Sequence, residues 1–94
     1  MRRVSRGRVW RGDVEIDLGP REFALLELFM RRAGDALTRL QLLEHGWDDA
    51  YESRSNIVDV YVARLRAKID RPFGVRSIET MRGAGYRLRE DGGA

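Results

Sequence analysis

The clearest helical pattern in the chain covers residues 55–70. Apolar side chains recur there at helical spacing, and at about 100° per residue they share one side of a helix. This apolar stripe consists of Val58, Val62, Leu65 and Ile69. The opposite side carries small or nearly uncharged side chains, with basic residues at its margins. The pattern predicts a helix that buries one face in a core and leaves a slim second face exposed.

Two further helices are expected before this segment. Pro20 stands where a helix can begin without needing an N–H, and the apolar pattern behind it predicts a helix over about 20–33. Thr38 and Gln41 have the spacing of a capping box, in which each side chain satisfies a backbone N–H of the other residue. A second, shorter helix should therefore span about 38–46.

Short stretches rich in β-branched residues predict a hairpin at each end of the chain. Residues 9–18 read as two strands about a Gly-Asp turn, and residues 75–88 read as two strands about a glycine-rich turn at 82–85. Residues 47–53 have no periodicity and hold three acids, so an exposed loop is expected there. The predicted order is strands, three helices and a hairpin.

Composition narrows the possible classes of protein. A chain of 94 residues with 43% hydrophobic residues suits one small domain. It contains no cysteine, which excludes disulfides and thiolate metal sites. No apolar run approaches the roughly 18 residues of a membrane span, so a cytoplasmic location is expected. The net charge of +3 and the preference for arginine over lysine favour a polyanionic partner.

The two faces of the predicted helix at 55–70 fit one such partner. A helix enters the DNA major groove, which is about 12 Å wide, when its leading face is slim and its margins carry cations for the phosphates. The slim face consists of Asn56, Val60, Ala63 and Ala67; Arg64 and Lys68 border it on one side and Arg66 on the other. A surface helix with ordinary solvated charges would show the same pattern, so this segment alone leaves both interpretations open.

Three helices followed by a hairpin with an arginine in its turn have the plan of a winged helix. Two motifs then carry a closer resemblance: Val-Asp-Val-x-Val-x-Arg-Leu-Arg-x-Lys at 58–68 and Thr-x-Arg-Gly-x-Gly-Tyr at 80–86. In this order they resemble the OmpR/PhoB family of response-regulator effector domains, and the likeness runs from about Val9 to Leu88. It implies an α+β winged helix-turn-helix domain that binds DNA. The recognition helix, at about 55–70, would lie in the major groove, and the wing, at about 81–87, at the minor groove or the backbone.

The resemblance also implies an order of domains. Members of this family open with a four-stranded sheet, of which this sequence shows only the later strands, and a phosphorylatable receiver domain normally precedes it. We therefore expect a partial N-terminal sheet over 1–18, a winged-helix core over 19–88 and a disordered tail over 89–94. The receiver domain is absent from these residues, and the chain looks truncated at its front.

The helix pattern and the family motifs together give a set of candidate DNA-binding residues. Some of them could contact bases, and others could contact phosphates from the ends of the helices or from the wing. The set is Thr38, Arg39, Trp47, Asn56, Val60, Ala63, Arg64, Arg66, Lys68, Thr80, Arg82, Gly83 and Tyr86.

Several of these residues have structural alternatives. The Asn56 amide can bind adenine through two hydrogen bonds, but asparagine is equally favoured as a helix cap. Arg66 could contact DNA or form an internal ion pair with Asp59 or Asp70. The helix N-terminus at Thr38 suits a phosphate, yet a purely structural cap is the stronger expectation. Trp47 matches a position of the family that both packs and touches DNA, and packing is expected to dominate.

The resemblance further implies partners. We expect double-stranded DNA, bound as direct repeats by two protomers, together with the absent receiver domain and its sensor kinase. The matching loop in the family contacts RNA polymerase, which makes an acidic group a candidate contact surface. This group is Asp48, Asp49 and Glu52.

An enzyme and a protein-binding module are the two alternative functions. An enzyme would need a nucleophile, base or metal cluster, and His45 is the sole histidine in a chain without cysteine. We therefore expect no catalysis, no cofactor and no metal. A winged helix that binds a protein in place of DNA is the remaining alternative, because a fold does not determine a function.

Overall fold

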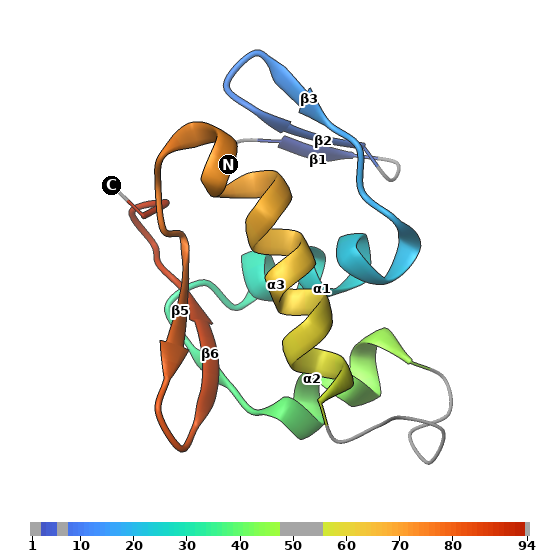
Figure 1. Cartoon of the computed structure of the whole chain (residues 1–94), viewed down its shortest axis with the longest axis vertical. Helices are drawn as coiled ribbons and strands as arrows, with labels where there is room; N and C mark the ends of the chain where they lie inside the picture. The colour runs from blue at the N-terminus through green and yellow to red at the C-terminus, as the bar shows by residue number, and fades with distance from the viewer. Residues whose placement is uncertain (1–2, 6–7, 48–55, 94) are drawn as a thin grey trace.

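The computed structural model describes residues 3–5, 8–47 and 56–93, and over these residues the chain has the predicted α+β architecture (Figure 1). The helices are α1 (Pro20–Arg31), α2 (Arg39–Gly46) and α3 (Ile57–Ile69). An N-terminal antiparallel sheet has the order β1-β2-β3, from β1 (Arg3–Ser5), β2 (Arg8–Arg11) and β3 (Val14–Ile16). A second antiparallel sheet has the order β4-β6-β5, from β4 (Ala36–Leu37), β5 (Ile78–Met81) and β6 (Gly85–Leu88). The β5–β6 hairpin is called the wing below.

The long helix α3 forms where the apolar stripe predicts it. All four residues of the stripe are at most 3% exposed, and they pack against α1 and α2. The helix begins at Ile57 and ends at Ile69, slightly inside the expected range of 55–70. The short 3-10 turn η2 (Arg71–Phe73), which contains Pro72, follows it. Proline lacks the N–H that a continuing helix would use, which explains the end of α3.

The two shorter helices begin as their capping signals predict. At α2 the Gln41 N–H donates to Thr38 Oγ1 at 3.0 Å, and the Thr38 N–H donates to Gln41 Oε1 at 2.8 Å, which confirms the capping box. At α1 the Gly19 N–H donates to Glu22 Oε1 at 2.9 Å. That helix ends at Arg31, about one half-turn earlier than expected.

Strand β4 is a feature that the sequence pattern does not predict. Its two residues pair with β6, with Leu37 opposite Tyr86. The approach is so close that a Cβ on Gly85 would lie 2.0 Å from the Leu37 carbonyl oxygen. The Gly85 φ of 109° is also one that other residues rarely adopt. Glycine at position 85 therefore allows the wing to join the segment between α1 and α2.

A disordered tail is expected at 89–94, but the described part of it, residues 89–93, is bonded to the rest of the domain. The Arg89 N–H donates to the Ser77 carbonyl oxygen at 2.7 Å, and Arg11 donates from Nη2 to the Gly92 carbonyl oxygen. Residues 89–93 thus form turns that fold back on the domain. The Gly92 N–H closes one turn locally by donating to the Arg89 carbonyl oxygen, but the bonds with Ser77 and Arg11 join distant parts of the chain, which a reading of local composition misses.

The core lies where the three helices meet the two sheets. Its largest fully buried apolar side chains are Phe29, Leu25, Leu26, Leu37, Leu42, Leu65, Ile69, Val9 and Val62. Among the helices of the described residues, none is long and apolar enough to cross a bilayer.

Candidate nucleic-acid interface

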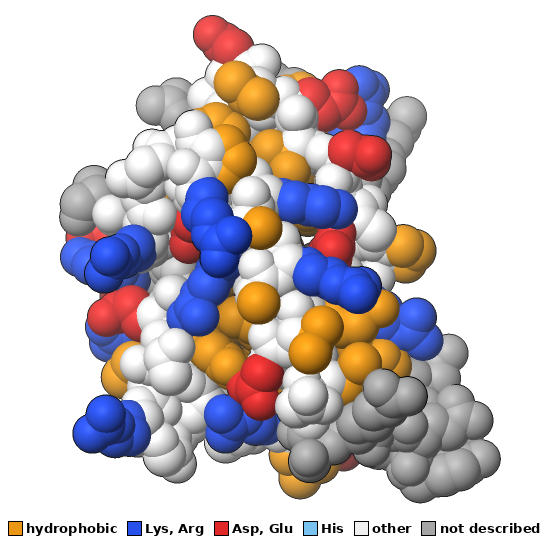
Figure 2. Space-filling view, in the orientation of Figure 1, with side chains coloured by type: hydrophobic (Ala, Val, Ile, Leu, Met, Phe, Trp, Pro, Cys, Tyr) orange, Lys and Arg blue, Asp and Glu red, His pale blue; other side chains and the backbone are white. Residues whose placement is uncertain are grey.

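The outward face of α3 is the first component of the site. Val60 is 37% exposed, and Ala63 and Ala67 on the same face are exposed as well. Burial of Val60 and Ala63 inside the domain would have excluded a helix that reads a DNA groove. Both side chains are exposed instead. Figure 2 shows Lys and Arg side chains on both sides of a central strip over α3. The helix thus presents a narrow, weakly polar ridge between cations.

Asn56 precedes this ridge at the N-cap of α3. Its backbone has φ −104° and ψ 8°, and its side chain makes no capping hydrogen bond. The structural alternative, in which the amide is occupied by the helix end, is therefore not what the structure shows. The amide group is exposed and available to a ligand.

Arg64 lies on the exposed side of α3 and is held against an aromatic cluster. Its guanidinium lies 4.8 Å from the Tyr61 ring centre, and the Tyr61 ring meets Trp47 edge-on at 5.2 Å. The guanidinium of Arg21, on α1, lies 5.7 Å from the Trp47 ring centre. Trp47 thus packs between α1 and α3, as expected. The stacked Arg64 keeps its N–H donors exposed while its position is restricted.

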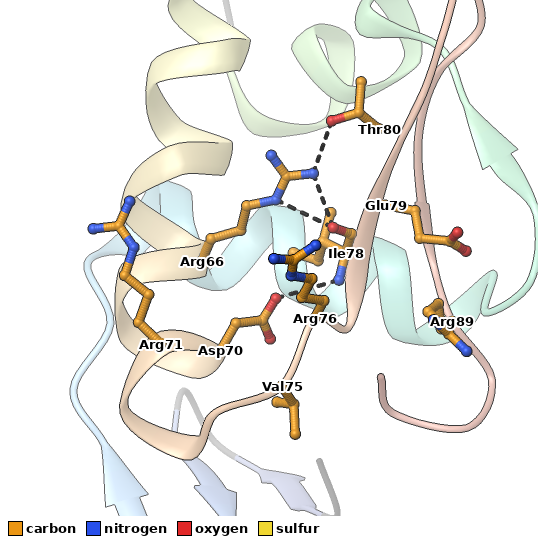
Figure 3. Close-up of a pocket in the computed structure, with 9 residues that line it drawn as sticks. All are labelled: Arg66, Asp70, Arg71, Val75, Arg76, Ile78, Glu79, Thr80 and Arg89. Carbon is orange, nitrogen blue, oxygen red and sulfur yellow. Dashed lines mark hydrogen bonds between the residues drawn. The ribbon is translucent and has the colours of Figure 1, made fainter. Parts of the chain in front are cut away.

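Arg66 is directed at the wing (Figure 3). It donates from Nε and Nη2 to the Ile78 carbonyl oxygen at 3.2 and 2.8 Å, and from Nη2 to Thr80 Oγ1 at 3.0 Å. The proposed ion pair of Arg66 with Asp59 or Asp70 is absent from the described residues. Arg66 and Thr80 therefore join α3 to β5, and their bonding capacity is partly used inside the domain.

Lys68 also has an internal partner. Its Nζ lies 2.7 Å from Glu22 Oε1 on α1. Glu22 is 6% exposed. Burial is the largest influence on the pKa of Glu22 and raises it, but hydrogen bonds from Lys68 and from the Gly19 N–H together hold the pKa below its ordinary value. Lys68 therefore ties α3 to α1.

The N-terminal end of α2 lies against the wing through Arg39 and Tyr86. The Arg39 Nε donates to the two carboxylate oxygens of Asp59 at 3.0 and 3.2 Å. The Tyr86 hydroxyl donates to the same carboxylate, and Tyr86 is only 5% exposed. The hydrogen bond to Asp59 raises the pKa of Arg39. Tyr86 is thus a buried residue of the interface scaffold, whereas Thr38 and Arg39 are exposed beside it.

The turn of the wing is open to solvent. Arg82 and Gly83 are exposed, and the Ala84 N–H closes the turn by donating to the Met81 carbonyl oxygen at 2.8 Å. Gly83 has a φ of 75°, which a side chain would disfavour. Within the described residues Arg82 has no hydrogen-bond or ion-pair partner, which leaves its guanidinium available.

A groove of about 660 Å³ lies between the C-terminal half of α3 and the wing (Figure 3). Sequence reasoning missed two arginines that line it, Arg71 and Arg76, which are exposed. The sequence feature that could have pointed to them is their position on either side of Pro72, in a segment without helical periodicity. The groove adds positive charge next to Arg66.

The acidic group Asp48, Asp49 and Glu52 lies outside the described residues. Among the residues that the structure describes, no cluster of three metal-binding side chains was found.

Comparisons with known proteins identify close relatives. Residues 13–88 match the family described as "Transcriptional regulatory protein, C terminal". The transcriptional regulatory protein TcrA of Mycobacterium tuberculosis is 67% identical over 89 residues, which cover 95% of this chain and 35% of TcrA. CusR of Escherichia coli is 45% identical over 85 residues, which cover 90% of this chain and 37% of CusR.

A solved structure of similar size agrees with these matches. The DNA-binding domain of Bacillus subtilis CssR is 32% identical and superposes with a TM-score of 0.76, covering 92% of this chain and 97% of that domain. The chain spans about a third of the length of TcrA and CusR.

Proposed function

Because the chain belongs to the OmpR/PhoB-type family of transcriptional regulatory C-terminal domains, we propose that it binds duplex DNA sequence-specifically as the effector half of a two-component regulator. This family consists of DNA-binding domains of transcription factors and is not an enzyme family. We propose accordingly that the domain has no catalytic activity, needs no cofactor or metal, and acts in the cytoplasm.

The observation that carries the proposal is the exposed ridge of α3 bordered by cations. Val60 and Ala63 could contact thymine methyl groups, and Asn56 at the leading end could read an adenine edge. The open wing turn supports a second contact, in which Arg82 enters the minor groove or binds its phosphates. We propose α3 as the recognition helix and the wing as its neighbour on the same duplex.

The remaining candidates divide by their contacts. Arg64 and Thr38 are exposed and suit phosphates or bases, as does the backbone of Gly83. Arg39 is exposed as well, but its Nε is paired with Asp59, so a phosphate contact would use its remaining N–H donors. The others are engaged within the domain, and their proposed part is to hold the surface in shape or to add a secondary phosphate contact. These are Trp47, Arg66, Lys68, Thr80 and Tyr86.

Partners beyond DNA follow from the family. We propose that two protomers bind direct repeats, and that in the full-length regulator a receiver domain, phosphorylated by a sensor kinase, promotes this pairing.

We also propose that the acidic group Asp48, Asp49 and Glu52 contacts RNA polymerase. The change Asp49→Lys should then leave DNA affinity intact and lower activated transcription in vitro. Unchanged transcription would contradict the polymerase contact.

Selection of bound duplexes from a random pool tests the main proposal. We expect a sequence motif to be enriched, and the selected duplex to bind more tightly than a scrambled one at the same salt concentration. Binding without enrichment would contradict sequence-specific recognition. No binding to any duplex at low salt would favour the alternative, a winged-helix module that contacts proteins.

A further inference from the structure

The carboxylate of Asp59 lies where the three DNA-facing elements meet. Asp59 belongs to the first turn of α3. It pairs with Arg39 from the first turn of α2, with Nε to Oδ1 at 3.0 Å, and it accepts the hydroxyl hydrogen bond of Tyr86 from β6. Arg39 and Tyr86 lie 20 and 27 residues away in sequence. A short side chain thus joins α2, α3 and the wing.

The Tyr86 ring is held from two sides by guanidinium groups. Arg39 lies 5.9 Å and Arg66 5.3 Å from the ring centre. Arg66 continues the connection along the wing through the Ile78 carbonyl oxygen and Thr80 Oγ1. The network therefore fixes the base of the wing relative to α3 at several points, while the wing turn stays exposed.

The protonation state of Tyr86 suits this arrangement. Burial, followed by the hydrogen bond to Asp59, raises the pKa of the Tyr86 hydroxyl above its ordinary value of 10.0. The hydroxyl accordingly keeps its proton and can donate to Asp59 at neutral pH.

An acidic residue near DNA phosphates is electrostatically unfavourable, so Asp59 needs a compensating role. We propose that Asp59 is a positioning residue for DNA recognition, because its carboxylate holds α2 and the wing at fixed places around α3. Base recognition by α3 in the major groove and contact by the wing at the neighbouring minor groove then depend on each other. This inference rests on the proposed function, and it predicts a loss of sequence discrimination more than a loss of affinity.

Two substitutions separate the parts of the network. Asp59→Asn removes the charge that holds Arg39 and weakens the bond from Tyr86. Tyr86→Phe removes only the hydroxyl and leaves the Asp59–Arg39 pair in place. Asp35→Asn is the matched control for charge, because Asp35 pairs with Arg32 at 3.3 Å on the exposed surface between α1 and β4.

The measurement is the ratio of dissociation constants for a scrambled and a selected duplex, at one salt concentration and with folding checked by circular dichroism. We expect Asp59→Asn and Tyr86→Phe each to lower this ratio by about fivefold or more, as suits the loss of a hydrogen bond to a charged group. Asp59→Asn should keep or increase binding to the scrambled duplex, because a negative charge is gone. The Asp35→Asn control should retain the wild-type ratio.

A ratio that stays at the wild-type value in folded Asp59→Asn and Tyr86→Phe would overturn the inference. If Asp59→Asn does not fold, Tyr86→Phe alone decides. A measurement without DNA separates this inference from the proposed function. Amide hydrogen exchange in β5 and β6 should be faster in Tyr86→Phe than in the wild type and in Asp35→Asn, and equal exchange would overturn the positioning role even if the wild-type domain bound no DNA.

Discussion

The basic residues of the candidate interface differ in whether their N–H donors are already bonded within the domain. Arg66 and Lys68 are bonded to the wing and to Glu22, so contact with DNA would compete with these bonds. Arg64 stacks on Tyr61 but keeps its donors exposed, and Arg82 extends from an open turn. An unoccupied guanidinium gains more from a phosphate than one that must first give up a partner. Arg82 and Arg64 should therefore contribute more to binding than Arg66 and Lys68.

Arg82→Ala tests this order at the wing. We expect weaker binding to the selected duplex, and a plot of log affinity against log salt whose slope falls by about one unit, because one phosphate contact is lost. Fluorescence anisotropy at several salt concentrations measures both quantities. Arg31→Ala on α1, which removes an exposed pair with Glu27, should change neither. An unchanged slope in Arg82→Ala would show that the wing arginine does not neutralise a phosphate.

Asn56→Ala tests base reading at the leading end of α3. The amide makes no capping bond, so its removal should cost little stability. If it reads a base, discrimination at one position of the site should fall by about 1 to 3 kcal/mol, while other positions keep theirs. Competition binding with single-base variants of the selected duplex measures this change. Equal weakening on every sequence would assign Asn56 to the backbone.

At the scale of elements, the contact between α1 and α3 depends on a partly buried ion pair. Glu22 has a folded-state pKa below its ordinary 4.5, despite the opposing effect of burial. A lowered pKa means that the pair stabilises the domain at pH values above about 4.5, and that this contribution is lost as the pH falls through the lower, folded-state value. Stability should therefore decline in acid in a way that depends on Glu22.

Glu22→Gln tests this link through chemical denaturation at pH values from about 7 down to about 3. We expect the wild type to exceed the variant in free energy of unfolding at neutral pH. The difference should shrink below pH of about 4.5 as the carboxyl becomes protonated. Glu44→Gln, at an exposed position of α2, is the matched control and should stay close to the wild type. A difference that is constant with pH would contradict the role given to the Glu22 carboxylate.

Sequence patterns predicted the elements with strong local signals. The apolar stripe of α3, the capping box of α2 and the glycine turn of the wing each depend on residues within a few positions of one another. Strand β4 gave no such signal, because its two residues form a strand only through pairing with β6. The attachment of residues 89–93 to Ser77 and Arg11 was missed for the same reason.

In the candidate site, too, features with local signals were predictable and features that depend on distant contacts were not. The exposed ridge of α3 and the wing turn were predictable from periodicity and from the family motifs. The internal partners of Lys68 and Tyr86 were not, since Glu22 lies 46 residues and Asp59 27 residues away in sequence. Local patterns show which side chains can face outward, but only tertiary contacts show which of them are already engaged.

At the scale of the whole molecule, Arg11 joins parts that are distant in sequence. It donates from Nη1 to the Ile69 carbonyl oxygen at 2.8 Å and lies 3.6 Å from the Asp70 carboxylate. Asp70, which is 4% exposed, also accepts hydrogen bonds from the Ser77 N–H and hydroxyl. Figure 1 shows the N-terminal sheet beside the C-terminal end of α3, where the chain continues toward the wing. The sheet is thus attached to the end of α3 and to the segment that leads into β5 through a buried charge pair.

Arg11→Met should therefore destabilise the entire domain. The change leaves the buried Asp70 without its cation, and loss of one partner of a buried pair costs about 3 kcal/mol or more. Arg8→Met is the matched control in the same strand, because Arg8 pairs with Glu15 on the surface, where such pairs contribute little. Urea unfolding followed by circular dichroism should show one transition with a lower midpoint for Arg11→Met and a nearly unchanged midpoint for Arg8→Met. Two separate transitions in the wild type would instead mean that the N-terminal sheet unfolds on its own, and that Arg11 does not couple it to α3.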